Sequence, residues 1–142
     1  MSPAQPHRRS RPSGGAAPPA LGLLGERLAA DHLRRRGLEV IARNLRTAQG
    51  EIDIVAREGD ALVFVEVKTR RAQPRARPLS PAVPLERLSR RQRQRLRRLA
   101  AAYLRETAAV RPWATVVRLD AIGVTVDTRG RLLRLDHLQD AW

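Results

Sequence analysis

The chain has 142 residues, with 28 Lys and Arg residues against 14 Asp and Glu residues, which gives a formal net charge of +14. This length fits one domain with a core of its own, and the absence of cysteine excludes disulfides, cysteine-ligated metals and a cysteine nucleophile. No apolar run approaches the ~20 residues of a membrane span, and residues 1–20 lack the apolar segment of a secretory signal. We therefore expect a cytoplasmic protein without a membrane partner.

Residues 1–20 carry a net charge of +3 and contain five Pro, so we expect a disordered basic tail followed by a folded domain over residues 21–142. A helix is predicted over residues 21–36, where apolar residues recur at helical spacing and Gly37 follows. Its expected buried face consists of Leu21, Leu24, Leu28, His32 and Leu33. Gly22 and Gly25 in this helix indicate that its backbone closely approaches another group, whose identity the sequence leaves open.

Three strands are predicted next, over residues 38–44, 51–57 and 61–69. The turn residues at 58–60 join the second and third strands into an antiparallel hairpin. The third strand is the most apolar segment of the chain and is predicted to be central in the sheet. In the second strand, alternation places Ile52, Ile54 and Ala56 on one face and Glu51, Asp53 and Val55 on the other.

Residues 72–84 contain four Pro and are predicted to form a flexible basic loop. A long helix is predicted over residues 85–107, followed by strands over 115–126 and 132–135 and a turn of helix over 136–142. The expected buried stripe of the long helix consists of Leu85, Leu88, Leu96, Leu99 and Tyr103. This order of elements predicts an α/β fold in which helices flank a mixed central sheet.

Glu66 and Lys68 are candidates for chemistry, because they share one face of the most apolar strand, where an unpaired charge is unfavourable. Val63, Val65 and Val67 take the opposite face. Asp53 lies on the neighbouring strand of the hairpin and is expected to approach Glu66. Two carboxylates that converge repel each other, and a divalent cation relieves the repulsion, so Asp53 and Glu66 are the predicted ligands of Mg²⁺ or Mn²⁺.

A cation held in this way polarises a phosphodiester and supplies hydroxide near neutral pH. Lys68 is expected to orient the attacking water or to stabilise charge on the phosphate, and Glu26 on the first helix offers a further ligand or hydrogen-bond acceptor. Taken alone, a Glu-x-Lys tripeptide is more often a solvated ion pair. The flanking valines, the nearby Asp53 and the fact that Lys68 is the only Lys beside 27 Arg favour catalysis.

Four further polar residues are given structural interpretations. Glu51 is interpreted as a solvated acid at a strand end, and Asp120 as the partner of an Arg. His32 is expected to be half-buried with its hydrogen bonds made, and His137 to be isolated near the C-terminus.

The segments GEIDIVA at 50–56 and FVEVKTR at 64–70 together resemble the YraN family of small bacterial proteins, which belongs to the restriction-endonuclease-like, or PD-(D/E)XK, nuclease superfamily. The similarity extends over residues 21–142. It implies a restriction-endonuclease-like α-β-β-β-α-β core, with Asp53 and Glu66 as metal-binding acids, Lys68 as the catalytic lysine and Glu26 as the acid on the first helix. The family's usual Lys in the long helix is Arg90 or Arg91 here.

Residues 70–98 carry a net charge of +10, which favours a polyanionic partner. With only four aromatic residues, contact with the phosphate backbone is expected rather than base stacking. The candidate nucleic-acid-binding residues are Arg70, Arg71, Arg90, Arg91 and Arg97. The leading hypothesis is a Mg²⁺- or Mn²⁺-dependent endonuclease-like protein acting on DNA. The alternatives are a non-catalytic nucleic-acid-binding module that acts with a partner enzyme, and a protein that binds RNA.

Overall fold

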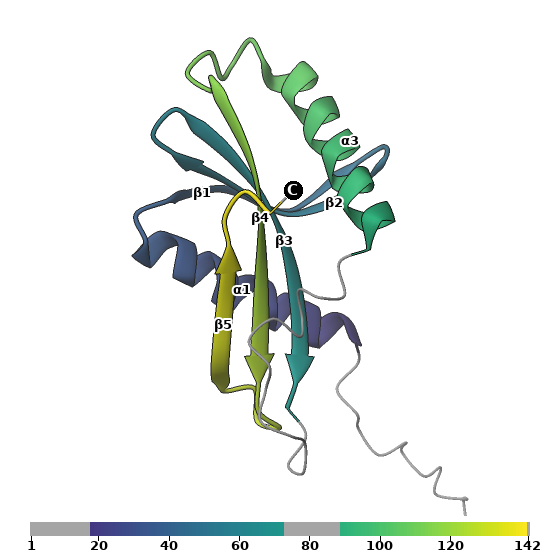
Figure 1. Ribbon diagram of the computed structural model, residues 1–142, viewed down its shortest axis with the longest axis vertical. Helices are drawn as coiled ribbons and strands as arrows, with labels where there is room; N and C mark the ends of the chain where they lie inside the picture. Colours follow the sequence, from purple (N-terminus) through teal and green to yellow (C-terminus); the bar gives the residue numbers. More distant parts are fainter. Residues whose placement is uncertain (1–17, 73–88, 142) are drawn as a thin grey trace, which may run out of the picture.

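The computed structural model describes residues 18–72 and 89–141, which form two helices and five strands. In chain order these are α1 (Pro18–Arg35), β1 (Glu39–Thr47), β2 (Gly50–Glu58), β3 (Ala61–Arg71), α3 (Arg90–Thr107), β4 (Val116–Val126) and β5 (Leu132–Leu138) (Figure 1). The strands form one sheet in the order β1-β2-β3-β4-β5, in which only β3 and β4 pair in parallel. The predicted mixed sheet and the α-β-β-β-α-β order are confirmed.

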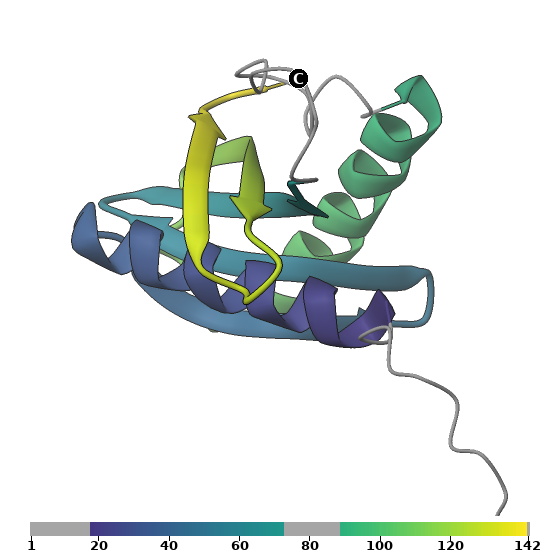
Figure 2. The ribbon, with the colours of Figure 1, turned by 90° about the horizontal axis from the view of Figure 1, so that it is seen from below.

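The two helices lie on opposite faces of the sheet, as Figure 2 shows, and each covers a core of its own. The core on the α1 side includes Ala29, Leu33, Ile54, Val63 and Val65. The core on the α3 side includes Val55, Phe64, Leu96, Leu99 and Tyr103. The Phe64 and Tyr103 rings meet edge to face with their centroids 5.6 Å apart. Burial of a large apolar side chain such as Phe64 contributes about 1.5–3 kcal/mol, so the two cores fix the sheet between the helices.

Helix α1 begins at Pro18, three residues before the predicted start of the folded domain. Proline is suited to a first helical turn, where its missing N–H has no intrahelical partner in any case. The rest of the predicted tail, residues 1–17, lies outside the described residues. At the other end, Gly37 adopts a φ of 88°, and the Leu38 N–H donates to the Leu33 carbonyl, which ends the helix where the sequence predicted.

Helix α3 begins at Arg90, later than predicted, because Ser89 caps it. The Ser89 hydroxyl accepts from the Gln92 N–H at 3.2 Å, and the Gln92 carboxamide accepts from the Ser89 N–H at 2.9 Å. Leu96, Leu99 and Tyr103 are buried as predicted. Leu85, Leu88 and residues 73–84 of the predicted loop lie outside the described residues.

The predicted turn of helix at the C-terminus is wrong for Asp136, His137 and Leu138. These residues continue β5 instead, because they pair with Gly123, Ile122 and Ala121 of β4 in an antiparallel ladder. Pairing with β4 satisfies backbone groups that a short helix would leave open. Trp142 lies outside the described residues.

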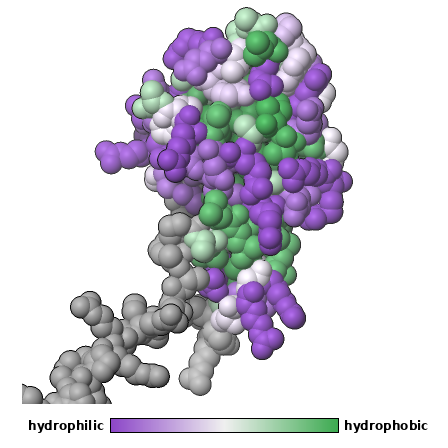
Figure 3. Space-filling view, turned by 180° about the vertical axis from the view of Figure 1, so that it is seen from behind, coloured by the Kyte–Doolittle hydropathy of each residue, from purple (hydrophilic) through white to green (hydrophobic). Residues whose placement is uncertain are grey.

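Hydrophilic side chains cover much of the surface seen from behind in Figure 3, with hydrophobic areas between them. The exposed large apolar side chains among the described residues include Leu23 and Leu133. None of the helices in the described part of the chain is both long and apolar enough to cross a bilayer.

Candidate functional site

Strands β2 and β3 separate at Asp53, and this fork defines the candidate site (Figure 1). The β2–β3 ladder runs from Glu58↔Ala61 only as far as Ile54↔Val65, whereas residues before Ile54 pair with β1 alone. Separation of the strands leaves the Val67 N–H without a β2 carbonyl, and the Asp53 carboxylate accepts from it at 2.8 Å. The fold therefore holds this carboxylate in the opening between the two strands.

The fork also explains why the predicted alternation of β2 is wrong. Ile54 and Ala56 lie together in the core on the α1 side, as predicted. Ile52, however, lies with Val55 in the core on the α3 side. A regular strand cannot place positions 52 and 55 on the same face. The change of face falls at Asp53, where β2 leaves β3 and follows β1.

Glu66 and Lys68 lie on the β3 side of the fork and share one face, as predicted, with the Lys68 ammonium 3.4 Å from a Glu66 carboxylate oxygen. The Glu66 side chain is 9% exposed and that of Lys68 is 29% exposed. Val63 and Val65 belong to the core on the opposite face, and Val67 packs against it. Lys68 is therefore held next to a buried acid, with part of its side chain still open to solvent.

Glu26 reaches the fork from α1, because this helix lies very close to β3 one residue earlier. A methyl group at Gly25 would overlap the hydroxyl of Thr69, so only glycine fits there, and the close approach predicted for Gly25 is confirmed. At Gly22, by contrast, no atom of the other described residues lies within 4 Å of the position of a Cβ, the adjacent backbone of α1 aside. The Glu26 carboxylate accepts a hydrogen bond from the side chain of Asn44, whose φ is 50°. Its Oε2 atom is buried and has no hydrogen-bond partner among the residues that the structure describes.

Three carboxylates converge at the fork. One oxygen from each of Glu26, Glu51 and Asp53 lies within 4.8 Å of the other two. Glu66 lies outside this group of three, but its charge acts on Asp53: burial and the Glu66 carboxylate together raise the pKa of Asp53 to about 8. Burial also raises the pKa of Glu26, although the hydrogen bond from Asn44 opposes this. The site thus gathers acidic side chains in a chain whose net charge is +14.

This arrangement suits a divalent cation. Carboxylate oxygens are the ligands that Mg²⁺ and Mn²⁺ prefer, and a cation offsets the repulsion that raises the pKa of Asp53. Asp53 is common to the pair predicted from the sequence and to the group found in the structure. Glu51 was interpreted as a solvated strand-end acid, and although its side chain is exposed it belongs to the group. The unpartnered Oε2 of Glu26 is a further oxygen available to a cation.

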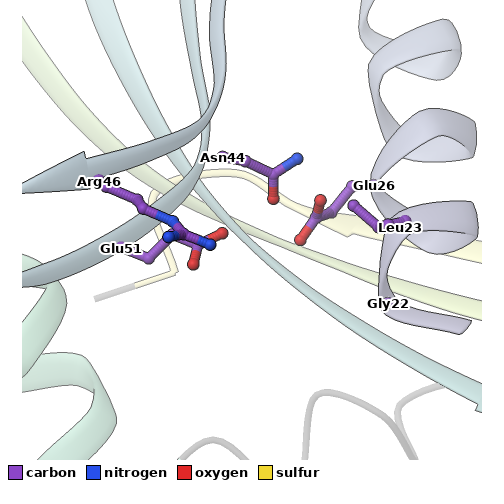
Figure 4. A pocket seen from close by; sticks show the side chains of 6 residues that line it. All are labelled: Gly22, Leu23, Glu26, Asn44, Arg46 and Glu51. Carbon is purple, nitrogen blue, oxygen red and sulfur yellow. The ribbon is translucent and has the colours of Figure 1, made fainter. Parts of the chain in front are cut away.

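Beside the acids lies a cavity of about 430 Å³, shown in Figure 4. Glu26 enters it from α1, Asn44 and Arg46 from β1, and Glu51 from β2, and the side chains of Glu26 and Asn44 point toward each other. The sequence did not single out Asn44 or Arg46. The signal that identifies Arg46 is its pairing opposite Glu51 across the β1–β2 hairpin, which places a cation next to the acids.

The Arg residues predicted to bind nucleic acid lie in two places. Arg70 and Arg71 end β3 and partly serve the fold: Arg70 Nε donates to Thr125 Oγ1 at 3.3 Å, and Arg71 Nη1 donates to the Thr128 carbonyl at 2.9 Å. The other three, Arg90, Arg91 and Arg97, are exposed on α3. No ion pair holds any of these three within the described ranges.

Asp120 belongs to a separate buried network. Arg118 Nε donates to it at 2.9 Å, which confirms the predicted pairing with an Arg. His137 Nε2 lies 2.8 Å from the same carboxylate, and His137 Nδ1 lies 3.1 Å from His32 Nε2. The prediction that His137 is isolated is therefore wrong, whereas the half-buried, bonded His32 is confirmed. Both Asp120 oxygens and both His137 ring nitrogens have partners within this network, which links β4, β5 and α1, so we assign it a structural role.

Comparison with known proteins agrees with the resemblance drawn from the two motifs. A model of the uncharacterised protein family UPF0102 matches residues 25–124, which include all four acids and Lys68. A UPF0102 protein from Rhodococcus opacus is 42% identical over 123 residues, 87% of this chain and 96% of the relative. One from Streptomyces griseus is 48% identical over 111 residues, 78% of this chain and 87% of the relative. The chain belongs to the uncharacterised protein family UPF0102, in agreement with the YraN resemblance and with a restriction-endonuclease-like core.

Proposed function

We propose that this protein is a divalent-cation-dependent nuclease that hydrolyses phosphodiester bonds of DNA. The observation that carries the proposal is the convergence of the Glu26, Glu51 and Asp53 carboxylates at a fork of the sheet, with the Glu66–Lys68 pair on the other side of the fork. Acids that raise one another's pKa are unfavourable unless they serve a ligand or a reaction. The excess of positive charge elsewhere in the chain supports a polyanionic substrate.

Asp53 is the proposed central ligand, because it lies between the Glu26–Glu51 side and the Glu66 side of the fork. Its hydrogen bond from the Val67 N–H fixes one oxygen and leaves the other to a cation. A bound Mg²⁺ or Mn²⁺ supplies a Lewis acid for the phosphate and lowers the pKa of a water molecule.

Lys68 is the proposed catalytic side chain with a positive charge, in addition to the bound metal ion. Its ammonium group is a compact donor, and its contact with Glu66 at 3.4 Å keeps it at the edge of the acidic group. From there it can donate hydrogen bonds to the attacking water or to a phosphate oxygen, where charge grows in the transition state. Arg46 lies in the wall of the neighbouring cavity, and it is the proposed contact for another phosphate of the DNA strand that is cleaved.

The test is cleavage of single-stranded, duplex and branched DNA by the full chain with Mn²⁺, with Mg²⁺ and with EDTA. We expect cleavage only with a cation and a loss of at least about 100-fold in Asp53→Asn, the size typical of a removed catalytic group. Asp31→Asn is the matched control and should cleave like the wild type, because this carboxylate of α1 lies outside the group of acids and forms an ion pair with Arg34.

Cleavage that persists in Asp53→Asn would overturn the assigned site. A wild-type protein that binds DNA but cleaves none of these substrates with either cation would favour the non-catalytic binding module. Tighter binding to structured RNA than to duplex DNA would contradict DNA as the substrate.

A further inference from the structure

A second polar cavity, of about 320 Å³, lies where α3 passes the turn between β1 and β2. It is lined by Gln49 from that turn and by Arg95, Arg98 and Leu99 from α3. Leu99 belongs to the core on the α3 side, so the cavity has an apolar floor below two guanidinium groups and one carboxamide. We call this cavity, defined by these four residues, the arginine notch.

Arg95 and Arg98 belong to a row of arginines along one edge of α3. Arg91, Arg95, Arg98 and Arg105 are spaced at i, i+4, i+7 and i+14, which places them on one side of a helix. This row borders the buried stripe, since the notch includes Leu99. Arg90, Arg93 and Arg97 lie instead on the outward side of α3. Of the residues predicted from the sequence to contact nucleic acid in this helix, only Arg91 therefore belongs to the row.

The positive charge of this row is not compensated within the described part of the chain. The ion pairs found there hold Arg34, Arg118 and Arg134, but none of the arginines of α3. Like charges one turn apart on a helix repel each other. The fold therefore neutralises Arg118 with two acids and leaves α3 with seven Arg and one Glu over its length. An external anion would offset this repulsion.

The position of the notch indicates which anion this is. The β1–β2 hairpin has the arginine notch on one side, at Gln49, and the cavity with Glu26, Asn44, Arg46 and Glu51 on the other. Glu51 and Gln49 are two residues apart across the turn that ends at Gly50. A polymer with regularly spaced anionic groups can contact the whole arginine row of α3. A single small anion would contact only one part of the row. Arginine also matches the geometry of phosphate with paired donors.

We propose that the arginine notch binds backbone phosphates of a DNA strand and holds this strand beside the hairpin that carries Glu51 and Asp53. This inference rests on the proposed function for its choice of substrate, but it requires no cation and no cleavage. Arg95 and Arg98 are the phosphate contacts, Gln49 donates from the turn, and the rest of the arginine row extends the contact along α3.

The test is equilibrium binding of a fluorescein-labelled DNA duplex to the full chain in EDTA, measured by anisotropy over a range of salt concentrations. In Arg95→Gln/Arg98→Gln we expect at least about a tenfold weaker affinity at low salt. The slope of log Kd against log salt should fall by about 1.8, because each phosphate contact contributes about 0.9. Glutamine is a good helix former, and both side chains are exposed, so circular dichroism should show an unchanged fold.

The matched control is Arg35→Gln/Arg36→Gln, which removes the same charge at the end of α1 that lies away from α3 in Figures 1 and 2. It should keep the wild-type slope. An equal loss in the two double variants would overturn the proposal, because it would show a response to net charge alone. An unchanged affinity of Arg95→Gln/Arg98→Gln for the duplex would also overturn the proposal. The same holds if the wild-type protein binds polyglutamate as tightly as it binds the DNA duplex. An effect confined to Arg95 and Arg98 in a protein that cleaves nothing would uphold the notch and reject the nuclease.

Discussion

Gly25 shows how a residue without a side chain positions the functional group next to it. At this point α1 approaches β3 so closely that the space of a methyl group is taken by Thr69. Glu26 follows directly in the chain and reaches the fork because of that approach. Gly22, one turn earlier, has free space around it and needs no such contact.

We predict opposite effects of alanine at these two glycines. Gly25→Ala should lower the free energy of unfolding by about 1–3 kcal/mol, as overpacking does, because α1 must move away from β3. Gly22→Ala should raise it by about 0.5–1 kcal/mol, because alanine favours the helix and nothing obstructs it. Urea denaturation of both variants measures this. A Gly25→Ala protein as stable as the wild type would show that the contact with Thr69 does not set the position of α1.

At the scale of elements, Asp120 joins β4 to β5 and to the segment after it. Burial alone would raise its pKa, but hydrogen bonds from His137, Arg118 and the Asp140 N–H outweigh burial and lower it. An acid whose pKa is lower in the folded state stabilises the fold above its unfolded pKa, and this contribution is lost as the pH falls through the folded pKa. His137 also contacts His32, so the network joins β4 and β5 to α1.

We therefore predict that Asp120→Asn lowers the free energy of unfolding by about 3 kcal/mol at pH 7, as the loss of one partner of a buried ion pair does. The difference from the wild type should shrink as the pH falls below 3.8, the ordinary pKa of Asp, because the unfolded wild-type chain then takes up a proton that the folded Asp120 binds only at its lower pKa. Denaturation at a series of pH values checks this. A difference that stays constant down to pH 3 would contradict the assignment of the effect to the charge of Asp120.

Elements whose contacts are local in sequence were predictable, and those that depend on distant partners were not. The β2–β3 hairpin follows from a short turn between two apolar runs, and the position of Glu66 and Lys68 on one face follows from strand alternation. The prediction that His137 is isolated was wrong because its partner His32 is 105 residues away in the sequence. The convergence of Glu51 with Glu26 and Asp53 was missed for the same reason, since Glu26 comes from another element across the fork.

For the whole molecule, the distribution of charge is the main feature. The acids converge where β2 and β3 separate, whereas arginines without an ion pair in the described part of the chain lie along α3 on the other side of the β1–β2 hairpin. The net charge of +14 could be read from composition, and so could its concentration in residues 70–98. The arginines that flank the hairpin could not be identified from the sequence, because their position depends on how α3 packs on the sheet.

We propose that the acids at the fork bind a divalent cation, and titration calorimetry with Mn²⁺ measures this binding. The pKa of Asp53 is raised to about 8, so its carboxyl group is largely protonated at pH 7 and must release a proton when a cation binds. The heat of binding should therefore differ between two buffers of different ionisation enthalpy. Asp31→Asn should bind Mn²⁺ like the wild type, and Asp53→Asn should not bind it. A wild-type protein that binds no Mn²⁺, or an Asp53→Asn protein that binds it equally well, would contradict the account.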